Sequence, residues 1–292
     1  VTLWIAAAIL TPMLIIYAVI HNIEDLPNKR RWGWVLIGVG FAIGAVLLWD
    51  EFHLKNFRFM VNPNLVEDIR GVATAGGQFP WVWEAFFNSL FLASFQTVIV
   101  VTVSSLAGYY LSRFAFTGRS LFLQSLLVLQ AFPAITLVIP IFLIVYWVGL
   151  VNTIYAPILV ITALELPFFI FIMKGFFDAV PWDIEMSAMT DGASRRQAFR
   201  MVILPQVRVG LIAVGVFAFI KGWEEYVFVT GLTTGQSYTV MSTYLYYVSE
   251  DVMGVDYGIV AAVAVLYLLP ALLLYIACQK YLTQMTLGGV KG

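Results

Sequence analysis

Ionisable side chains are scarce in this chain, and a few of them stand inside long apolar runs. Glu165 lies in ALELPFF, whereas Lys221, Glu224 and Glu225 lie in KGWEEYVF. A charge buried in an apolar environment is costly, so each group must face a cavity, pair with an opposite charge or be protonated. Lys221 and Glu225 have the i, i+4 spacing of an ion pair on one helix, which leaves Glu224 to face elsewhere. These patterns leave open whether the residues are structural or line a path for a polar solute.

Three aromatic residues, Trp223, Tyr226 and Phe228, accompany those charges. Aromatic faces stack on pyranose rings, so with Glu165 and Glu224 they could line a path for a sugar. Aromatic residues in membrane helices also serve packing and interfacial roles. Both interpretations stay open from the sequence.

Other catalytic chemistry has few residues to use. His21 and His53 are the two histidines, and the chain offers no partners that would complete a triad or a zinc site with them. Cys278 is the single cysteine, which excludes a disulfide framework and a cysteine metal site. The phosphate-binding pattern GxxxxGK followed by Ser or Thr is absent. We therefore expect no enzyme active site, metal or cofactor on this chain, and an energy source in a partner or an ion gradient.

The composition indicates which elements must hold these residues. Hydrophobic residues make up 61% of the 292-residue chain and charged residues 11%, against about 25% charged residues in soluble domains. Several apolar runs reach about 18 to 25 residues, the length that crosses a bilayer, where backbone groups are satisfied within helices. We predict an all-α integral membrane protein, a polytopic helical bundle with about seven spans at residues 3–20, 34–49, 87–112, 121–147, 155–177, 211–231 and 257–281. The fourth run could be tilted or broken at Pro133 or Pro140.

Lysine and arginine are distributed unevenly among the connections between these runs. Most of them fall in alternate connections and at the C-terminus, whereas the opposite side has only Lys55, Arg58 and Arg70 beside eight acidic residues. By the positive-inside rule, residues 181–205 and the C-terminus are cytoplasmic, and the loops at 50–83 and 232–256 lie outside. The first run lacks the basic start and cleavage site of a secretory signal, so we expect a retained span. The net charge of −1 argues against nucleic acid as a partner.

The polar stretch 181–205 interrupts the apolar runs with the pattern of a helix, a turn and a helix. Pro181 suits a first helical position, and Asp183 and Glu185 place negative charge in the first turn, where the helix dipole favours it. Gly192 is placed to end this helix in a left-handed conformation. We therefore predict a short helical hairpin, apolar inside and charged outside.

The second helix of this hairpin has its own start and stop signals. Ser194 and Gln197 have the spacing of a capping box, and Pro205 favours an end at about Leu204. The predicted apolar faces consist of Trp182, Met186 and Met189 in the first helix and of Ala198, Phe199, Val202 and Ile203 in the second.

A polar hairpin of this kind can have three roles. Arg195, Arg196 and Arg200 would suit a DNA-reading helix-turn-helix, but membrane on both sides would keep that helix from a major groove. An amphipathic hairpin lying on the membrane surface stays open. A docking surface for a partner protein is the third role.

The sequence of the hairpin resembles the cytoplasmic loop of the permeases of binding-protein-dependent ABC importers. That loop reads E-A-A, three residues, G, nine residues, then I-x-L-P. Here Met186, Ser187 and Ala188 stand at E-A-A, Gly192 at the glycine, and the segment ends in Pro205, with Glu185 one position early. Further family-like positions occur in order at Asn88–Leu90, Ala107–Tyr109 with Arg113, Pro133 with Pro140, Gly149–Leu150 with Asn152, Pro167–Phe168, Gly175–Phe177 and Trp223–Tyr226.

The resemblance is to the carbohydrate branch, in particular the smaller membrane subunit of maltose-type systems, and covers the chain from about Trp34 to its end. It implies a type I ABC importer transmembrane domain at residues 33–292, preceded by an extra span and cytoplasmic connection at residues 1–32. This branch usually has six spans, and it usually has Asn where Glu224 follows Trp223.

The implied function is import of a sugar, most simply an oligosaccharide, through one half of a heterodimeric pore in a prokaryotic inner membrane. The implied partners are a second permease, a cytoplasmic ATPase dimer that binds ATP with magnesium, and an extracytoplasmic sugar-binding protein. A polyol or glycerol phosphate is the alternative cargo. The rival class is an ion-coupled secondary transporter or channel that would use Glu165 and Glu224.

The resemblance also implies roles for single residues in coupling to the ATPase. Met186, Ala188, Met189 and Phe199 would supply apolar contacts, Gly192 would permit close approach, and Asp191 and Arg195 would supply polar contacts at the rim. Glu185, Ser187 and Pro205 complete the coupling segment. The C-terminal tail, which resembles one that reaches the ATPases, consists of Gly288, Gly289, Val290, Lys291 and Gly292.

Overall fold

A computed structural model of the chain describes residues 54–61, 81–233, 238–250 and 257–288. The density of internal contacts divides the chain into two units, Val1–Asn56 and Phe57–Gly292. The predicted spans at 3–20 and 34–49 and the predicted boundary after residue 32 lie outside the described residues. The description below concerns the second unit.

Every regular element in the described part of the chain is helical, as the sequence predicts. In order these elements are η1 (Leu54–Met60), α4 (Val82–Arg113), α5 (Arg119–Gln130), η3 (Ala134–Leu137), α6 (Val138–Val148), α7 (Tyr155–Asp178), α8 (Trp182–Thr190), α9 (Arg195–Ala198), η4 (Phe199–Ile203, a π-helical turn), α10 (Leu204–Gln206), α11 (Arg208–Glu224), α12 (Val227–Leu232), α13 (Met241–Ser249) and α14 (Tyr257–Gly288).

Three of these helices are long and apolar enough to cross a membrane. They are α4, α7 and the part of α14 at Tyr257–Tyr281, and two bent helix pairs raise the number to as many as five in the described residues. The three continuous helices coincide with the predicted spans 87–112, 155–177 and 257–281, although α4 begins earlier, at Val82. The predicted outer loop at 232–256 contains the helix α13.

The predicted span 121–147 is broken, as its prolines suggested. Helix α5 and the following segment Ala134–Val148, which comprises η3 and α6, meet at 91° across a short break that contains Pro133. Gln130, the last residue of α5, donates a hydrogen bond from Nε2 to the carbonyl oxygen of Leu164 on α7, at 2.9 Å. The break is thereby tied to α7.

The predicted continuous span 211–231 is wrong. Helix α11 ends at Glu224, Glu225 is extended (φ −66°, ψ 119°), and α12 starts at Val227. The Oε1 atom of Glu225 accepts the backbone N–H of Phe228 at 2.8 Å, so the carboxylate satisfies a free donor at the start of α12. Because Glu225 lies outside α11, the pair with Lys221 that the spacing permits does not form within one helix.

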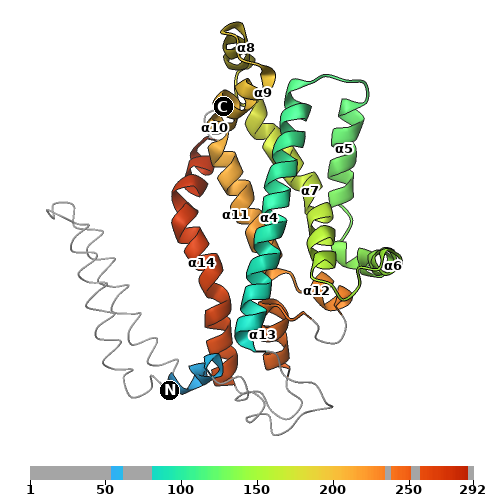
Figure 1. Cartoon of the computed structure of the whole chain (residues 1–292), viewed down its shortest axis with the longest axis vertical. Coiled ribbons are helices and arrows are strands. Elements are labelled where there is room, and N and C mark those ends of the chain that lie inside the picture. Colours follow the sequence, from blue (N-terminus) through green and yellow to red (C-terminus); the bar gives the residue numbers. More distant parts are fainter. Residues whose placement is uncertain (1–53, 62–80, 234–237, 251–256, 289–292) are drawn as a thin grey trace, which may run out of the picture. The chain divides into compact units, whose positions relative to one another are not determined.

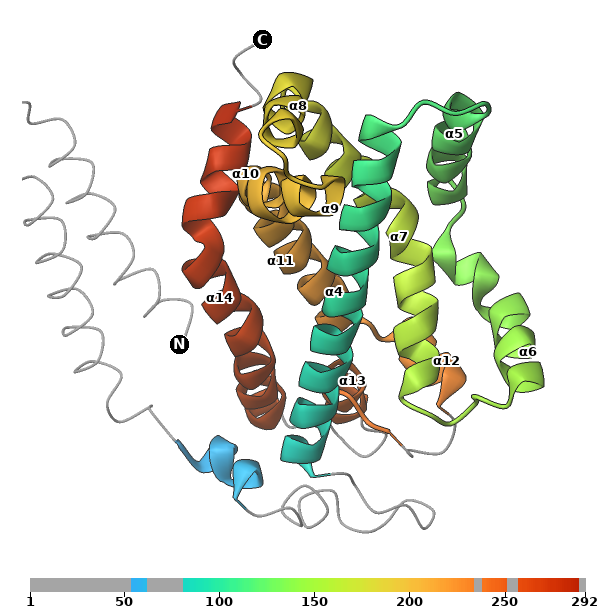
Figure 2. The same cartoon turned by 45° about the horizontal axis from the view of Figure 1, so that its top comes forward.

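Helix α4 packs against both α7 and α11 at points of very close backbone approach (Figures 1 and 2). Gly108 faces the backbone of Met173 and Lys174 on α7, and Gly222 on α11 faces Ala93 on α4. Both views place the hairpin elements α8 to α10 at the end of the bundle where α4 and α7 finish and α11 begins. The hairpin is therefore directly connected to the central helices.

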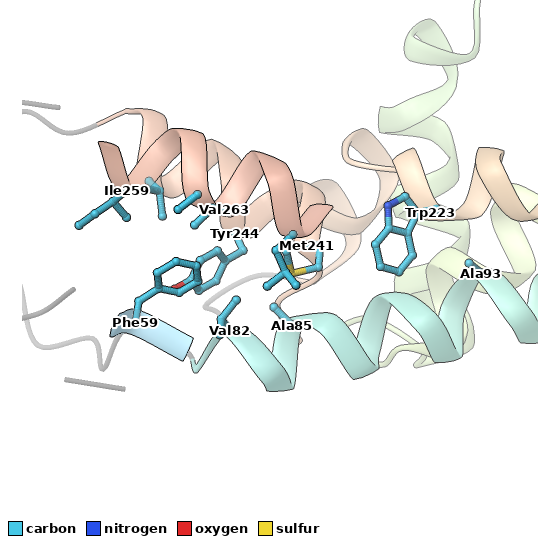
Figure 3. Packing of buried hydrophobic residues seen from close by; sticks show 12 residues of the cluster. Phe59, Val82, Ala85, Ala93, Trp223, Met241, Tyr244, Ile259 and Val263 are labelled. Atoms are coloured by element: carbon cyan, nitrogen blue, oxygen red, sulfur yellow. The ribbon is translucent and has the colours of Figure 1, made fainter. Parts of the chain in front are cut away.

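The largest buried cluster joins α4, α11, α13, α14 and η1. Figure 3 shows Trp223 and Ala93 at one end of it and Phe59, Val82 and Tyr244 toward the other. A separate cluster around Tyr109, Phe177 and Ile203 lies where the hairpin meets α4 and α7. The second cluster packs the ends of α4 and α7 against the second hairpin helix and the start of α11.

Candidate functional site: the hairpin at residues 181–205

The first helix of the hairpin, α8, begins and ends close to the predicted residues. Pro181 is its N-cap rather than its first residue, with Asp183 and Glu185 in the first turn. Gly192 follows in the left-handed conformation, at φ +96°. A Cβ atom on Gly192 would have no atom of this chain within 4 Å. The turn therefore needs glycine for its backbone angle and presents an open surface.

The second helix starts with the predicted capping box. The Ser194 hydroxyl accepts the N–H of Gln197 at 3.4 Å, and the Ser194 N–H donates to Oε1 of Gln197 at 2.8 Å. Each contact satisfies a backbone donor that the first turn of a helix leaves free. The start of this helix is therefore set by local sequence.

The second helical segment extends beyond the predicted end near Leu204, to Gln206. The π-helical turn η4 precedes α10, whose first turn includes Pro205, and the segment then bends by 74° into α11. Proline fits in a first helical turn because the N–H it lacks has no partner there. The hairpin therefore joins α11 through one bend at Val207 instead of a loop.

The inner side of the second helix is apolar, as predicted. Ala198 and Ile203 are fully buried. The Phe199 ring lies 4.5 Å from that of Tyr109 on α4 and 6.2 Å from that of Phe177 on α7, measured between centroids. Phe199, which is half-buried, therefore packs against α4 and α7 of its own chain, and its expected contact with an ATPase stays a prediction.

The predicted faces of α8 are wrong at Glu185, Trp182 and Met186, whereas Asp183 is exposed and Met189 is half-buried. Trp182 and Met186 are 39% and 40% exposed, whereas Glu185 is 0% exposed. The reason is that α4 brings a basic and a hydroxyl side chain to the carboxylate, so the acidic residue can be buried. Glu185 therefore points into its own chain, away from any partner that would cover the hairpin.

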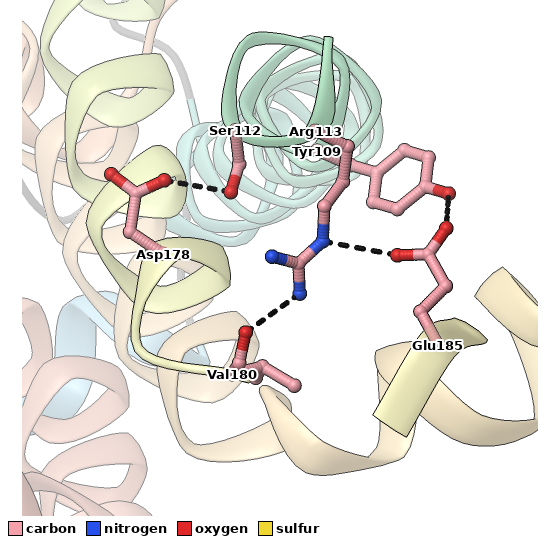
Figure 4. A network of polar contacts seen from close by, with 6 residues as sticks. All are labelled: Tyr109, Ser112, Arg113, Asp178, Val180 and Glu185. Carbon is pink, nitrogen blue, oxygen red and sulfur yellow. Dashed lines mark hydrogen bonds and ion pairs between the residues drawn. The ribbon is translucent and has the colours of Figure 1, made fainter. Parts of the chain in front are cut away.

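Figure 4 shows the polar network that receives Glu185. The Nε atom of Arg113 lies 3.0 Å from Oε2 of Glu185, with side chains 5% and 0% exposed. The Tyr109 hydroxyl donates to Oε1 of Glu185 at 2.5 Å, and Nη2 of Arg113 donates to the Val180 carbonyl at 2.9 Å. The Arg113 guanidinium also lies over the Trp182 ring, 5.4 Å from its centroid. This network is an internal support for α8.

A second polar contact joins α4 to α7 beside this network. The Ser112 hydroxyl donates to Oδ1 of Asp178 at 2.7 Å, and Asp178 also pairs with Lys174 one turn earlier. These groups are more open to solvent than the Arg113–Glu185 pair. They do not touch the hairpin.

Sequence reasoning missed Arg113 and Tyr109 as part of the site. The sequence singles out both only as positions that resemble the permease family. The sequence does contain a signal for this site. An arginine and a tyrosine stand one turn apart at the end of a predicted span, and such a pair can bind a carboxylate.

The outward side of the hairpin mixes apolar and basic groups. The exposed side chains include Trp182, Asp183, Met186, Ser187, Asp191, Arg195, Arg196, Arg200, Met201 and Pro205. Ala188 and Met189 are half-buried. Arg195 lies over the Phe114 ring, 4.8 Å from its centroid, which fixes its position at the edge of this surface. This is the surface available to a partner.

The four residues predicted for a solute path differ widely in exposure. Trp223 is 1% exposed, stacks against Phe219 and Tyr267, and donates a hydrogen bond to the Tyr267 carbonyl at 3.0 Å. The structure therefore favours the packing role for Trp223. Glu165 is half-buried on α7, Glu224 is exposed, and Tyr226 lies 5.0 Å from Tyr246 between ring centroids.

Sequence reasoning does not identify the buried polar residue Gln96 on α4. Gln96 on α4 is fully buried, and neither atom of its amide has a hydrogen-bond partner within the described residues. A glutamine inside the apolar run 87–112 was the signal for it. Gly288 ends α14, and the other four residues of the predicted tail lie outside the described part of the chain.

Long apolar helices with a capped helical hairpin at one end define a polytopic helical membrane protein. Residues 100–285, which include the whole hairpin, match the family of binding-protein-dependent transport system inner membrane components. The chain belongs to this family. It is thus an ABC transporter permease, a membrane subunit distinct from the ATPase subunits.

Two relatives support this membership along most of the chain. The diacetylchitobiose uptake system permease protein NgcG of Streptomyces coelicolor is 30% identical over 94% of this chain and 85% of its own length. The trehalose transport system permease protein SugB of Mycobacterium tuberculosis is 32% identical over 90% of this chain and 99% of its own length.

The fold is also found in a solved transporter. A bacterial ABC transporter involved in import of the acidic polysaccharide alginate has a chain that matches with a TM-score of 0.61, at 18% identity, over 89% of this chain and 99% of that chain. At this identity the match shows a common fold alone.

Proposed function

We propose that this chain is one half of the membrane pore of an ATP-driven sugar importer. The family match across residues 100–285, with the hairpin inside it, is the observation that supports this proposal most strongly. The other half is a second permease. An extracytoplasmic binding protein delivers the sugar to the outer side of the pore.

An oligosaccharide is the proposed cargo. Relatives named for uptake of diacetylchitobiose and of trehalose match this chain along nearly its whole length. Both names denote disaccharides. The cargo itself is chosen jointly with the second permease and the binding protein, so single residues of this chain do not define it.

The hairpin is the proposed docking element for a cytoplasmic ATPase. Its outer side presents Met186 and Arg195, its turn at Gly192 is open, and its internal support holds it as one body. A rigid element transmits a displacement to the helices attached to it, whereas a flexible loop absorbs it. ATP with magnesium binds to the ATPase subunits, and their closure moves the hairpin.

The geometry divides the predicted coupling residues into two groups. Met186, Ser187, Asp191 and Arg195 are exposed and suit contact with the ATPase, with Ala188 and Met189 at the edge. Glu185 and Phe199 face inward and position the hairpin. The tail from Gly288 to Gly292 is proposed to reach the ATPase as well. This places the hairpin and the C-terminus on the cytoplasmic side of the inner membrane.

Purification from native membranes tests the proposal. The tagged chain, solubilised in detergent, is expected to bring down a second permease and an ATPase, both identified by mass spectrometry. The assembly is then reconstituted into lipid vesicles together with its binding protein. These vesicles should take up diacetylchitobiose or trehalose only when ATP is present on the side of the membrane that carries the ATPase.

The same assay excludes the rival functions. Uptake by this chain alone, driven by an ion gradient without ATP, would establish a secondary transporter or channel instead. Uptake of a polyol or of glycerol phosphate in preference to both disaccharides would leave the importer class intact and contradict the sugar assignment.

A further inference from the structure

The hairpin is joined to two helices by the chain and to a third by side chains. Helix α7 enters it through Val180, and α11 leaves it after Val207. Helix α4 ends at Arg113, far from the hairpin in sequence. Any motion of the hairpin therefore reaches α7 and α11 through the backbone, but reaches α4 through packing and through the network in Figure 4.

Arg113 holds the base of the hairpin at three points. It pairs with the Glu185 carboxylate, donates to the Val180 carbonyl and lies over the Trp182 ring. Those points come before α8, at its start and within its first turn. Tyr109, one turn earlier on α4, holds the second oxygen of Glu185. The start of α8 is thus fixed to the end of α4 from several directions.

Burial makes this connection stiff. The Arg113 and Glu185 side chains are 5% and 0% exposed, so water cannot replace either partner without opening the site. Breaking a buried ion pair leaves an uncompensated charge in an apolar environment, which is strongly unfavourable. The exposed contact between Ser112 and Asp178 has no such penalty, because water can take over its hydrogen bonds.

Helix α4 is also the helix through which a displacement would spread. It lies in backbone contact with α7 at Gly108 and with α11 at Gly222, where neither contact has room for a side-chain atom. If α4 follows the hairpin, the three helices move as one body. If α4 does not follow, these two close contacts must slide.

We propose that the Arg113–Glu185 pair is the positioning pair that makes α4 follow the hairpin, so that ATP-driven motion of the hairpin is transmitted to the whole bundle. This inference rests on the proposed function, because it assumes that an ATPase moves the hairpin. It assigns Arg113 and Glu185 a role in transmission in addition to their contribution to folding.

A pair of neutralising substitutions separates transmission from folding. Glu185→Gln alone leaves the Arg113 charge buried without its partner, so assembly itself should suffer. The double variant Arg113→Met with Glu185→Gln removes both charges together. Replacing both partners of a buried ion pair by neutral residues often leaves the folding stability unchanged. The double variant should therefore assemble, yet the charged connection between α4 and α8 is gone.

The experiment uses the complete importer in proteoliposomes, with the binding protein and the wild-type partner subunits. ATP hydrolysis and uptake of the transported sugar are measured together, giving sugar transported per ATP. In the double variant this ratio is expected to fall about fivefold or more, the lower range of measured couplings between sites. Ser112→Ala, the neighbouring residue with its exposed contact to α7, is the matched control and should keep the wild-type ratio.

Unchanged sugar transport per ATP in an assembled double variant would overturn the inference and leave the pair a purely structural role. If the double variant does not assemble, Arg113→Lys decides: it keeps the charge but loses the forked geometry that reaches Glu185 and Val180 at once. Its ratio should fall as well, and a wild-type ratio would overturn the inference. If wild-type chain brings down no ATPase, the proposed function fails, and the inference falls with it.

Discussion

Gly108 on α4 faces the backbone of Lys174 on α7 so closely that a Cβ atom at position 108 would lie 2.8 Å from the Lys174 nitrogen. The neighbouring Met173 Cβ would be at 2.9 Å. Real Cβ atoms do not approach other atoms so closely, and backbone cannot swing aside as a flexible side chain can. Gly108 therefore sets the distance between α7, which leads into the hairpin, and α4, which contacts the hairpin through side chains.

Gly108→Ala should destabilise the protein by about 1 to 3 kcal/mol, the usual cost of forcing an extra carbon into a packed interface. The measurement is the thermal unfolding midpoint in detergent. Gly175→Ala is the matched control, because a Cβ at that glycine of α7 meets nothing within 4 Å. Equal midpoints for the two variants would contradict the close approach of α4 and α7.

Gly192→Asp should separate the chain from its ATPase. The left-handed angle at Gly192, φ +96°, costs a residue with a side chain about 1 to 2 kcal/mol. The side chain would also stand on the open surface that the ATPase is proposed to cover. The measurement is the amount of ATPase that copurifies with the tagged chain.

Gly118→Asp is the control for this effect. Gly118 is also left-handed, at φ +90°, with nothing within 4 Å of its Cβ, but it lies before α5 outside the hairpin. It imposes a similar strain and should retain the ATPase. Retention by both variants would count against docking at the Gly192 turn.

Ser194→Ala should loosen the start of the second hairpin helix. It removes the acceptor for the Gln197 N–H, and loss of such a cap costs about 1 kcal/mol. Amide hydrogen exchange in residues 195–206 should become faster, with little change in α7 or α14. Ser125→Ala, which removes an exposed hydroxyl contact within α5, is the control. Unchanged exchange in the hairpin would show that the capping box contributes little to its rigidity.

Trp223→Phe should lower stability without changing cargo preference. The substitution removes the indole N–H that donates to the Tyr267 carbonyl and leaves that buried acceptor without its partner, at a cost of about 1 to 3 kcal/mol. Thermal unfolding and competition among sugars in the uptake assay are the two measurements. A changed preference with an unchanged unfolding midpoint would instead place Trp223 in the sugar path.

The features that depended on local sequence were predictable. The left-handed Gly192, the capping box at Ser194 and the break at Pro133 each follow from residues within a few positions of one another. Long apolar runs likewise identified α4, α7 and α14. Local chemistry is enough for such features because neighbours along the chain supply all of the interacting atoms.

The burial of Glu185 could not be predicted in the same way. Helical periodicity placed the charge of α8 outside, because the sequence of α8 contains no partner for a buried carboxylate. The partners, Arg113 and Tyr109, come from the end of α4, and only the packing of α4 against α7 brings them there. The break between α11 and α12 has the same origin, since no glycine or proline marks it and Glu225 is held by contacts with Phe228 and Ser242.

Site-directed cross-linking at Met186 tests the central claim most directly. Met186 is 40% exposed on the outer side of the hairpin. A cysteine there, in a chain whose native Cys278 is replaced by serine, should form a short cross-link to the ATPase in native membranes. A cysteine at Tyr257, which is 80% exposed at the start of α14, should not. Cross-linking to the ATPase from Met186→Cys alone is the predicted result, and its absence in membranes that contain the assembled ATPase would contradict the account.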